Sequence, residues 1–222
     1  MGSSPLKLVV FDCDGTLVDS QHNIITCMEA SFKSNGLVAP NADKVRGIIG
    51  LNLDRAIYHL MEEKEDRELL GRLVDGYKQA FFENRLKDEH HEPLYEGVLE
   101  TLEKLASQNI LMAVATGKSL RGLNAVVEKH GLHDYFTSLQ TPDHNPGKPH
   151  PQMAYSAMEA VGADPAHTYM VGDTSYDMQL AKNAGIHAIG VEWGYHDNDT
   201  LSQTGADHLI SVADELIPIV SG

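Results

Sequence analysis

The sequence predicts an α/β protein with a parallel, doubly wound core sheet and a small, all-helical cap domain inserted after the first strand. Two observations lead to this prediction. Short apolar runs alternate with amphipathic helical patterns along most of the chain, which is typical of a parallel sheet covered by helices on both faces. One segment of about seventy residues contains helical patterns alone, and that is too long for an ordinary crossover between strands.

Four short apolar runs, rich in β-branched residues, predict buried strands. They are Leu8–Phe11, Ile110–Ala115, Thr168–Val171 and Ala188–Val191. Helical patterns lie between the later runs, at Val98–Ala106, Leu120–His130, Gln152–Val161 and Tyr176–Ala184. This alternation predicts a Rossmann-like core formed by residues 1–20 and 92–222.

Residues 21–91 interrupt the alternation. Helical patterns cover Ile24–Ser34, Ala42–Ile49, Leu53–Glu62 and Arg67–Leu86, and no convincing strand lies between them. The simplest explanation is a helical cap domain that grows out of the loop after the first strand. The core then resumes near "PLYEGV", residues 93–98.

The composition limits the partners and the setting. The chain of 222 residues carries 17 basic and 32 acidic side chains and a net charge of −15 at pH 7, which argues against nucleic acid and anionic membranes as partners. No apolar run reaches the length of a membrane span, and the opening "MGSSPLK" lacks the apolar stretch of a secretory signal. The only two cysteines, Cys13 and Cys27, lack zinc-like spacing and favour a reducing, cytoplasmic setting.

Polar side chains follow three of the predicted strands at the point where each strand ends. The first run leads into Asp12 and Asp14, and the second leads into Thr116. The run that starts at Thr168 is followed by "GDTSYD", with Asp173 and Asp177. Because functional groups collect beyond the carboxyl ends of the strands in an open parallel sheet, we expect these side chains to converge.

The expected cluster combines acids that repel one another with groups that bind anions. Clustered carboxylates resist ionisation unless a cation lies among them, and an all-oxygen site suits Mg²⁺. Thr116 and Lys148, from the loop "NPGKPHP", offer a hydroxyl and a cation to an anion such as phosphate, while Gly117 lets backbone N–H groups come close. Each signal alone has an ordinary explanation as a turn, a helix cap or, for Lys118, a solvated side chain. Together they predict a catalytic site.

Four motifs resemble those of a known family. The segments "DCDGTLVDS", "ATGK", "GKPHP" and "GDTSYDM" resemble the motifs of the haloacid dehalogenase superfamily of phosphohydrolases. The match is closest to its phosphoglycolate phosphatase-like members with a helical cap. It continues through "PLYEGVLETLEKL" and the late "GVEWGY" and "GADHLI", so it covers nearly the whole chain. The resemblance implies Mg²⁺-dependent hydrolysis of small phosphomonoesters through an aspartyl-phosphate intermediate.

The resemblance also implies a role for each site residue. Asp12 matches the nucleophile, and Asp14 matches the general acid/base that is held protonated by its crowded surroundings. The residues that match the phosphate-binding groups are Thr116, Gly117 and Lys148. The residues that match the metal ligands are Asp12, Asp14 (through its backbone carbonyl) and Asp173, with Asp177 as a supporting carboxylate.

Several alternatives are open. A sugar phosphomutase or a pyrophosphatase of the same superfamily would share the core motifs. Mutases carry a cap histidine and a cap arginine, which align here with Ile24 and Leu53, and His22 lies near the first position but out of register. Dehalogenases that attack carbon lack the second aspartate, so Asp14 and Asp173 argue against them. A signalling receiver domain also combines acids, Mg²⁺, a hydroxyl and a lysine, but it needs only about half this length.

The cap is expected to choose the substrate. Its "VRGIIGLNLDR" stretch, Val45–Arg55, resembles the cap loop that faces the active site in relatives. Arg46, Asn52 and Arg55 are candidates to reach a substrate carboxylate or hydroxyl, the alternative being that they are solvated. We expect a small phosphorylated metabolite, with phosphoglycolate as the named candidate; the sequence does not indicate an oligomeric state.

Overall fold

The computed structural model describes residues 5–62, 64–87 and 91–222. In this part of the chain, one parallel sheet has the strand order β3-β2-β1-β4-β5-β6. The strands are β1 Leu8–Phe11, β2 Leu111–Ala115, β3 Phe136–Gln140, β4 Thr168–Gly172, β5 His187–Val191 and β6 His208–Ile210. The predicted α/β class with a parallel, Rossmann-like core is therefore confirmed.

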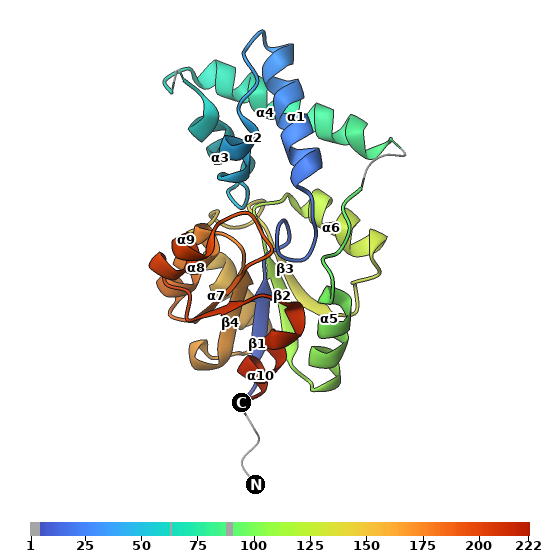
Figure 1. Cartoon of the computed structure of the whole chain (residues 1–222), viewed down its shortest axis with the longest axis vertical. Coiled ribbons are helices and arrows are strands. Elements are labelled where there is room, and N and C mark those ends of the chain that lie inside the picture. Colours follow the sequence, from blue (N-terminus) through green and yellow to red (C-terminus); the bar gives the residue numbers. More distant parts are fainter. Residues whose placement is uncertain (1–4, 63, 88–90) are drawn as a thin grey trace.

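Helices cover both faces of the sheet (Figure 1). One face packs against α5 Val98–Ser107, α6 Leu120–Lys129 and α10 Leu216–Ser221, and the other packs against α7 Gln152–Val161, α8 Ser175–Ala184 and α9 Asn198–Gln203. Two short 3₁₀ helices, η1 Pro165–His167 and η2 Ala213–Glu215, lie in the connections.

The central strand β1 is continuously apolar because it is buried on both faces of the sheet. Val9 and Phe11 point into the α5–α6–α10 layer, and Leu8 and Val10 point into the α7–α8–α9 layer. Successive side chains of a strand alternate between faces, so a strand buried on both sides has no polar position. β1 lies between β2 and β4, with Phe11 opposite Val114 and Val171. The loops after these three strands therefore open at one edge.

The sequence pattern did not reveal two of the strands. β3 reads "FTSLQ" and β6 reads "HLI", and neither is the continuous apolar run that the other strands show. Both lie at the edges of the sheet, where β3 is only partly buried and β6 has three residues. Edge strands bury less surface and so carry less apolar signal.

The segment after β1 contains the helices α1 Gln21–Ser34, α2 Ala42–Arg46, α3 Leu53–Leu60 and α4 Arg67–Arg85. They lie together at the top of Figure 1 and share an apolar cluster of their own, which includes Met28, Phe32, Val45, Ile57 and Leu73. We refer to these four helices and their connections as the cap. The predicted boundaries at residues 21 and 91 stay predictions.

The second and third cap helices are shorter than the sequence pattern predicts. α2 ends at Arg46, and residues 47–50 form a turn in which Gly50 has φ +98°. This turn leads the chain toward the core.

Two further predictions concern the ends and the apolar runs of the chain. Residues 1–4 of the expected signal-free opening lie outside the described residues. Among the residues that are described, no helix combines the length and the apolar character needed to cross a bilayer.

Candidate active site

Asp12 lies directly after β1 and is fully buried. Its backbone N–H donates to the carbonyl of Val171 at 2.9 Å, so the ladder between β1 and β4 fixes its position. Its Oδ1 atom accepts hydrogen bonds from the backbone N–H of Cys13 at 2.6 Å and from Nζ of Lys148 at 2.8 Å. Its Oδ2 atom is buried without a hydrogen-bond partner. One carboxylate oxygen is therefore held in place while the other is free to react or to bind a cation.

Lys148 supplies the positive charge of the site. Its side chain is 0% exposed, and its Nζ atom lies 2.8 Å from Oδ1 of Asp12 and 2.6 Å from Oδ1 of Asp177. Burial alone would lower the pKa of this lysine, but the charges of Asp12 and Asp177 outweigh burial and raise its pKa above the usual value. Lys148 is therefore a permanent cation between two acids.

Asp177 is positioned by the start of helix α8. It stands at the third position of the helix, where its Oδ2 atom accepts hydrogen bonds from the backbone N–H of Thr174 at 3.0 Å and from the Thr174 hydroxyl at 2.7 Å. Together with the hydrogen bond that the Thr174 side chain accepts from the backbone N–H of Asp177, these contacts form a capping box. A Cβ atom on Gly172 would lie 2.3 Å from Cγ of Asp177, so the strand passes close beneath this carboxylate. Asp177 thus both caps the N-terminus of α8 and binds Lys148.

Asp173 follows β4 and lies beside Asp12 because the two strands are paired. Its Oδ1 atom accepts a hydrogen bond from the hydroxyl of Thr16 at 2.8 Å, and its Oδ2 atom accepts one from the backbone N–H of Tyr195 at 2.9 Å. Gly15 has φ +88°, and a Cβ atom there would lie 2.2 Å from Oδ2 of Asp173. Only glycine fits this approach. The sequence analysis did not identify Thr16 and Tyr195 as the residues that hold the Asp173 carboxylate in position.

The acids gather closely enough to share a cation. Asp12, Asp173 and Asp177 each offer a carboxylate oxygen within 4.8 Å of the other two, and all three residues are buried. Burial raises the pKa of Asp12 to about 7 although Lys148 opposes the shift, and burial, reinforced by Asp12 and Asp177, raises the pKa of Asp173 well above its usual value. A bound cation would favour the ionised forms of both. This all-oxygen set, with an unpartnered Oδ2 atom on Asp12, fits a divalent cation.

Thr116 and Gly117 follow β2, next to β1 in the sheet. Thr116 is buried, and its hydroxyl accepts a hydrogen bond from the backbone N–H of Lys118 at 3.2 Å. A Cβ atom on Gly117 would lie 2.5 Å from the carbonyl oxygen of Leu51 and 2.6 Å from that of Gly50. The cap turn therefore rests on the core at Gly117, and a larger residue there would push the cap away.

The surroundings of Asp14 differ from the sequence-based expectation. Its Oδ1 atom accepts a hydrogen bond from the Ser20 hydroxyl at 2.5 Å and lies 2.9 Å from Nζ of Lys118. Lys118 was expected to be solvated, but its side chain is 9% exposed, lies 3.6 Å from Glu92 and stacks over the ring of Phe81 at 5.3 Å. Ser20 and Lys118 thus hold the side chain of Asp14 in this arrangement.

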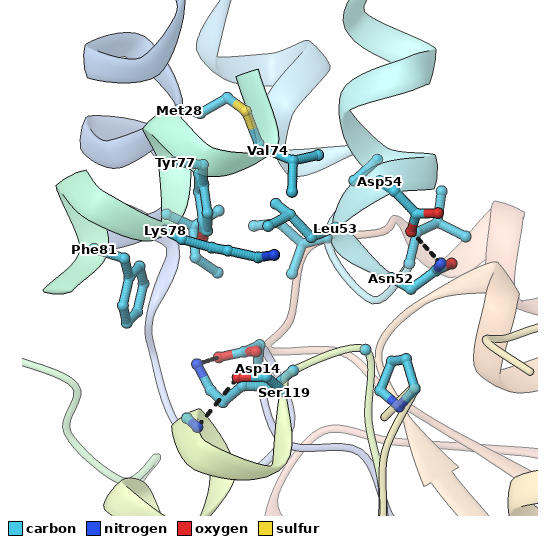
Figure 2. Close-up of a pocket in the computed structure, with 18 of the residues that line it drawn as sticks. Asp14, Met28, Asn52, Leu53, Asp54, Val74, Tyr77, Lys78, Phe81 and Ser119 are labelled. Carbon is cyan, nitrogen blue, oxygen red and sulfur yellow. Dashed lines mark hydrogen bonds and ion pairs between the residues drawn. The ribbon is translucent and has the colours of Figure 1, made fainter. Parts of the chain in front are cut away.

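A cavity of about 580 Å³ separates the cap from the core above Asp14 (Figure 2). Asp14, Gly117 and Lys118 contribute to its core side, and α1, α3 and α4 contribute to its cap side. Of the three predicted cap candidates, only Asn52 lines it. Arg46 instead binds Gln21 and Asp43, and Arg55 is exposed and does not line the cavity.

The fold and this site agree with a match to a family model. The model, described as "Haloacid dehalogenase-like hydrolase", matches residues 9–191, which contain Asp12, Asp14, Thr116, Lys148, Asp173 and Asp177. The chain belongs to the haloacid dehalogenase-like hydrolase family.

Curated relatives align over nearly the whole chain. "Probable phosphatase IndB" of Dickeya dadantii is 35% identical, over 95% of this chain and 91% of that protein. The phosphoglycolate phosphatase of Vibrio parahaemolyticus is 29% identical, over 100% and 99% of the two chains. The N-acetylmuramic acid 6-phosphate phosphatase of Pseudomonas putida is 30% identical, over 97% and 96%.

A solved structure shows the same fold. A haloacid dehalogenase-like family hydrolase from Streptococcus pneumoniae superimposes with a TM-score of 0.83 at 22% identity, covering 96% of this chain and 98% of that chain. At this identity the likeness concerns the fold alone.

The buried charge of Lys148 leads to a testable prediction. In Lys148→Met, Asp12 and Asp177 remain as buried carboxylates without a cation, and breaking a buried ion pair in this way costs about 3–5 kcal/mol. Protonation of the acids relieves this cost, so we expect the loss in unfolding free energy to be larger at pH 8 than at pH 5. Urea denaturation in EDTA measures both values.

The matched control is Lys182→Met. Lys182 lies 2.6 Å from Asp207, but both side chains are more than one third exposed, so this change should cost less than about 1 kcal/mol. Equal losses for the two variants, or a Lys148→Met loss that does not change with pH, would contradict the assignment.

Proposed function

We propose that the protein is a Mg²⁺-dependent phosphatase that hydrolyses small organic phosphomonoesters through an aspartyl-phosphate on Asp12. One observation carries the proposal. The Asp12 carboxylate is fully buried, bound at Oδ1 by Lys148 and a backbone N–H, and unpartnered at Oδ2. Such a carboxylate is oriented and charge-balanced on one side and available for attack on the other. Membership of a hydrolase family and relatives named as phosphatases support the same reaction.

The reaction is proposed in two steps. In the first, Oδ2 of Asp12 forms a bond to phosphorus while the bond from phosphorus to the leaving oxygen breaks, and Asp14 gives its proton to the leaving alkoxide. In the second, Asp14 takes a proton from water, the resulting hydroxide bonds to phosphorus, and the bond to Asp12 breaks. Thr116, the Gly117 backbone and Lys148 would bind the phosphate oxygens. Asp14 must leave its contact with Lys118 to carry the proton.

The proposed metal ligands are the side chains of Asp12 and Asp173 and the backbone carbonyl of Asp14, with Asp177 in support. Mg²⁺, when bound there, supplies positive charge that offsets the repulsion between the Asp12 carboxylate and the phosphate dianion. The hydrogen bonds from Thr16 and Tyr195 would hold the Asp173 carboxylate in position.

The cap is proposed to open and close over the site. The cavity reaches Asp14, while Asp12 is 0% exposed beneath it. A phosphate ester therefore reaches Asp12 only when the groups above it move. Closure would then exclude water from the reacting groups.

Hydrolysis is favoured over phosphoryl transfer between sugar positions. The two positions where mutases carry a histidine and an arginine, Ile24 and Leu53, both line the cavity with apolar side chains. Phosphoglycolate is one candidate substrate, alongside nucleotides, phosphosugars and pyrophosphate. Both cysteines are free thiols, which supports the proposed cytoplasmic location.

The direct test measures phosphate release from a panel of metabolites with Mg²⁺ and with excess EDTA. We expect release with Mg²⁺ alone. Asp12→Asn should reduce release to background, because the nucleophile is lost, and Asp14→Asn should lower kcat about 10²–10⁴-fold, because proton transfer is lost. Asp134→Asn, at an exposed aspartate outside the site, serves as the control. Full activity of Asp12→Asn, or full activity in EDTA, would exclude the mechanism.

Metal binding should also depend on pH. Because burial raises the pKa of Asp12 to about 7 in the metal-free protein, protons compete with the cation below neutrality. We therefore expect Mg²⁺ to raise the Tm more at pH 8 than at pH 6. Asp173→Asn, which removes a proposed ligand, should show little rise at either pH. A rise of the same size in Asp173→Asn would place the cation elsewhere.

A further inference from the structure

The cavity wall formed by the cap is largely apolar. Met28 of α1, Leu53 of α3 and Val74, Tyr77 and Phe81 of α4 line it, and Figure 2 shows these side chains gathered above Asp14. A cavity of about 580 Å³ with such walls has the size and character of a site for an organic ligand with a substantial apolar part. A two-carbon ester such as phosphoglycolate would leave most of this wall against water.

The same cavity concentrates positive charge in an acidic chain. Its lining includes four basic side chains, Lys78, Arg85, Lys118 and Arg121, and three acidic ones, Asp14, Asp54 and Asp143, whereas the whole chain has a net charge of −15. The acids are already engaged, because Asp14 binds Lys118, Asp54 accepts from Asn52, and Asp143 accepts from the backbone N–H of Leu120. Four basic and three acidic side chains give the lining a formal excess of one positive charge.

Lys78 is the basic group best placed to receive a ligand. Lys118 is occupied by Asp14, Arg121 stacks over the ring of Phe82 at 5.2 Å, and Arg85 is the last residue of α4, about two turns beyond Lys78. Lys78 makes no hydrogen bond or ion pair within the described part of the chain, and Figure 2 shows its ammonium group directed into the space between Leu53 and Asp14. The Lys78 side chain is exposed, so its ammonium group is accessible to an anionic ligand in the cavity.

We propose that Lys78 is a specificity residue for phosphomonoesters whose apolar or ring-shaped body carries a second anionic group. The inference rests on the proposed phosphatase function. The phosphate would lie at Asp12 and Thr116, the body against the cap wall, and the second anion, a carboxylate in its simplest form, at the Lys78 ammonium. The body and the second anion are both required, which distinguishes this class from phosphoglycolate.

Three esters separate these requirements. Phenyl phosphate has the body alone, phosphoglycolate has the carboxylate alone, and 4-carboxyphenyl phosphate has both. We expect the wild-type enzyme to show the highest kcat/KM for 4-carboxyphenyl phosphate. In Lys78→Gln, the ratio of kcat/KM for 4-carboxyphenyl phosphate to that for phenyl phosphate should fall about tenfold, mainly through KM. Lys78→Arg should retain most of the ratio, and Lys44→Gln, at an exposed cap lysine outside the cavity, should leave it unchanged.

The outcomes distinguish this inference from the proposed function. No phosphate release from any ester of this set or of the wider panel would overturn the proposed function itself. Release from other esters with no preference for 4-carboxyphenyl phosphate, or a preference for phosphoglycolate, would overturn only the role of Lys78. An equal loss on both phenyl esters in Lys78→Gln would show that Lys78 is structural and would also overturn the inference.

Discussion

The structure depends on one buried ammonium group, that of Lys148. It lies between Asp12 and Asp177 with no exposure to solvent. One buried cation therefore balances two acids, one directly after β1 and the other in the first turn of α8. Asp12 is fixed by the β1–β4 ladder, and Asp177 is fixed by the capping box of α8. Lys148 therefore joins the first strand and the fourth strand at the point where the proposed reaction takes place. Its charge lets a carboxylate stay close to other carboxylates, and it is the same charge that would receive a phosphate.

Close backbone approaches connect this centre to the cap. Gly15 allows Asp173 to lie against the loop after β1, and Gly117 allows the cap turn at Gly50 and Leu51 to rest on the core. These approaches bring the cap wall over Asp14 and create the cavity. The residues proposed to act on the phosphate and those proposed to face the organic part of a substrate thus come from different parts of the chain. Substitutions in the cap can therefore change the preferred substrate of the enzyme without any change in the core site.

The class of fold could be predicted because buried strands are continuously apolar. Asp12 and Asp173, the polar residues that follow two of these strands, lie close together, and Lys148 contacts Asp12. β3 and β6 were not predicted, since edge strands bury too little to leave an apolar run. The contact between Lys118 and Asp14 and the position of Lys78 could not be predicted either. Both depend on how the cap helices lie over the core. Packing between segments that are distant in the sequence leaves no pattern in the residues next to either lysine. For the same reason Arg46 and Arg55 were plausible candidates by sequence, yet neither lines the cavity.

The central claim is that Asp12, balanced by Lys148 and a divalent cation, forms a covalent bond to phosphorus. The most direct measurement is mass spectrometry of Asp14→Asn protein, quenched in acid after incubation with a hydrolysed ester and Mg²⁺. Loss of the acid/base at position 14 should slow the hydrolysis step, so the account predicts one phosphoryl group on the peptide that contains Asp12, and none when EDTA replaces Mg²⁺. Phosphate release by wild-type protein without any phosphoryl group on this peptide in the variant, or a phosphoryl group on another residue, would contradict the account.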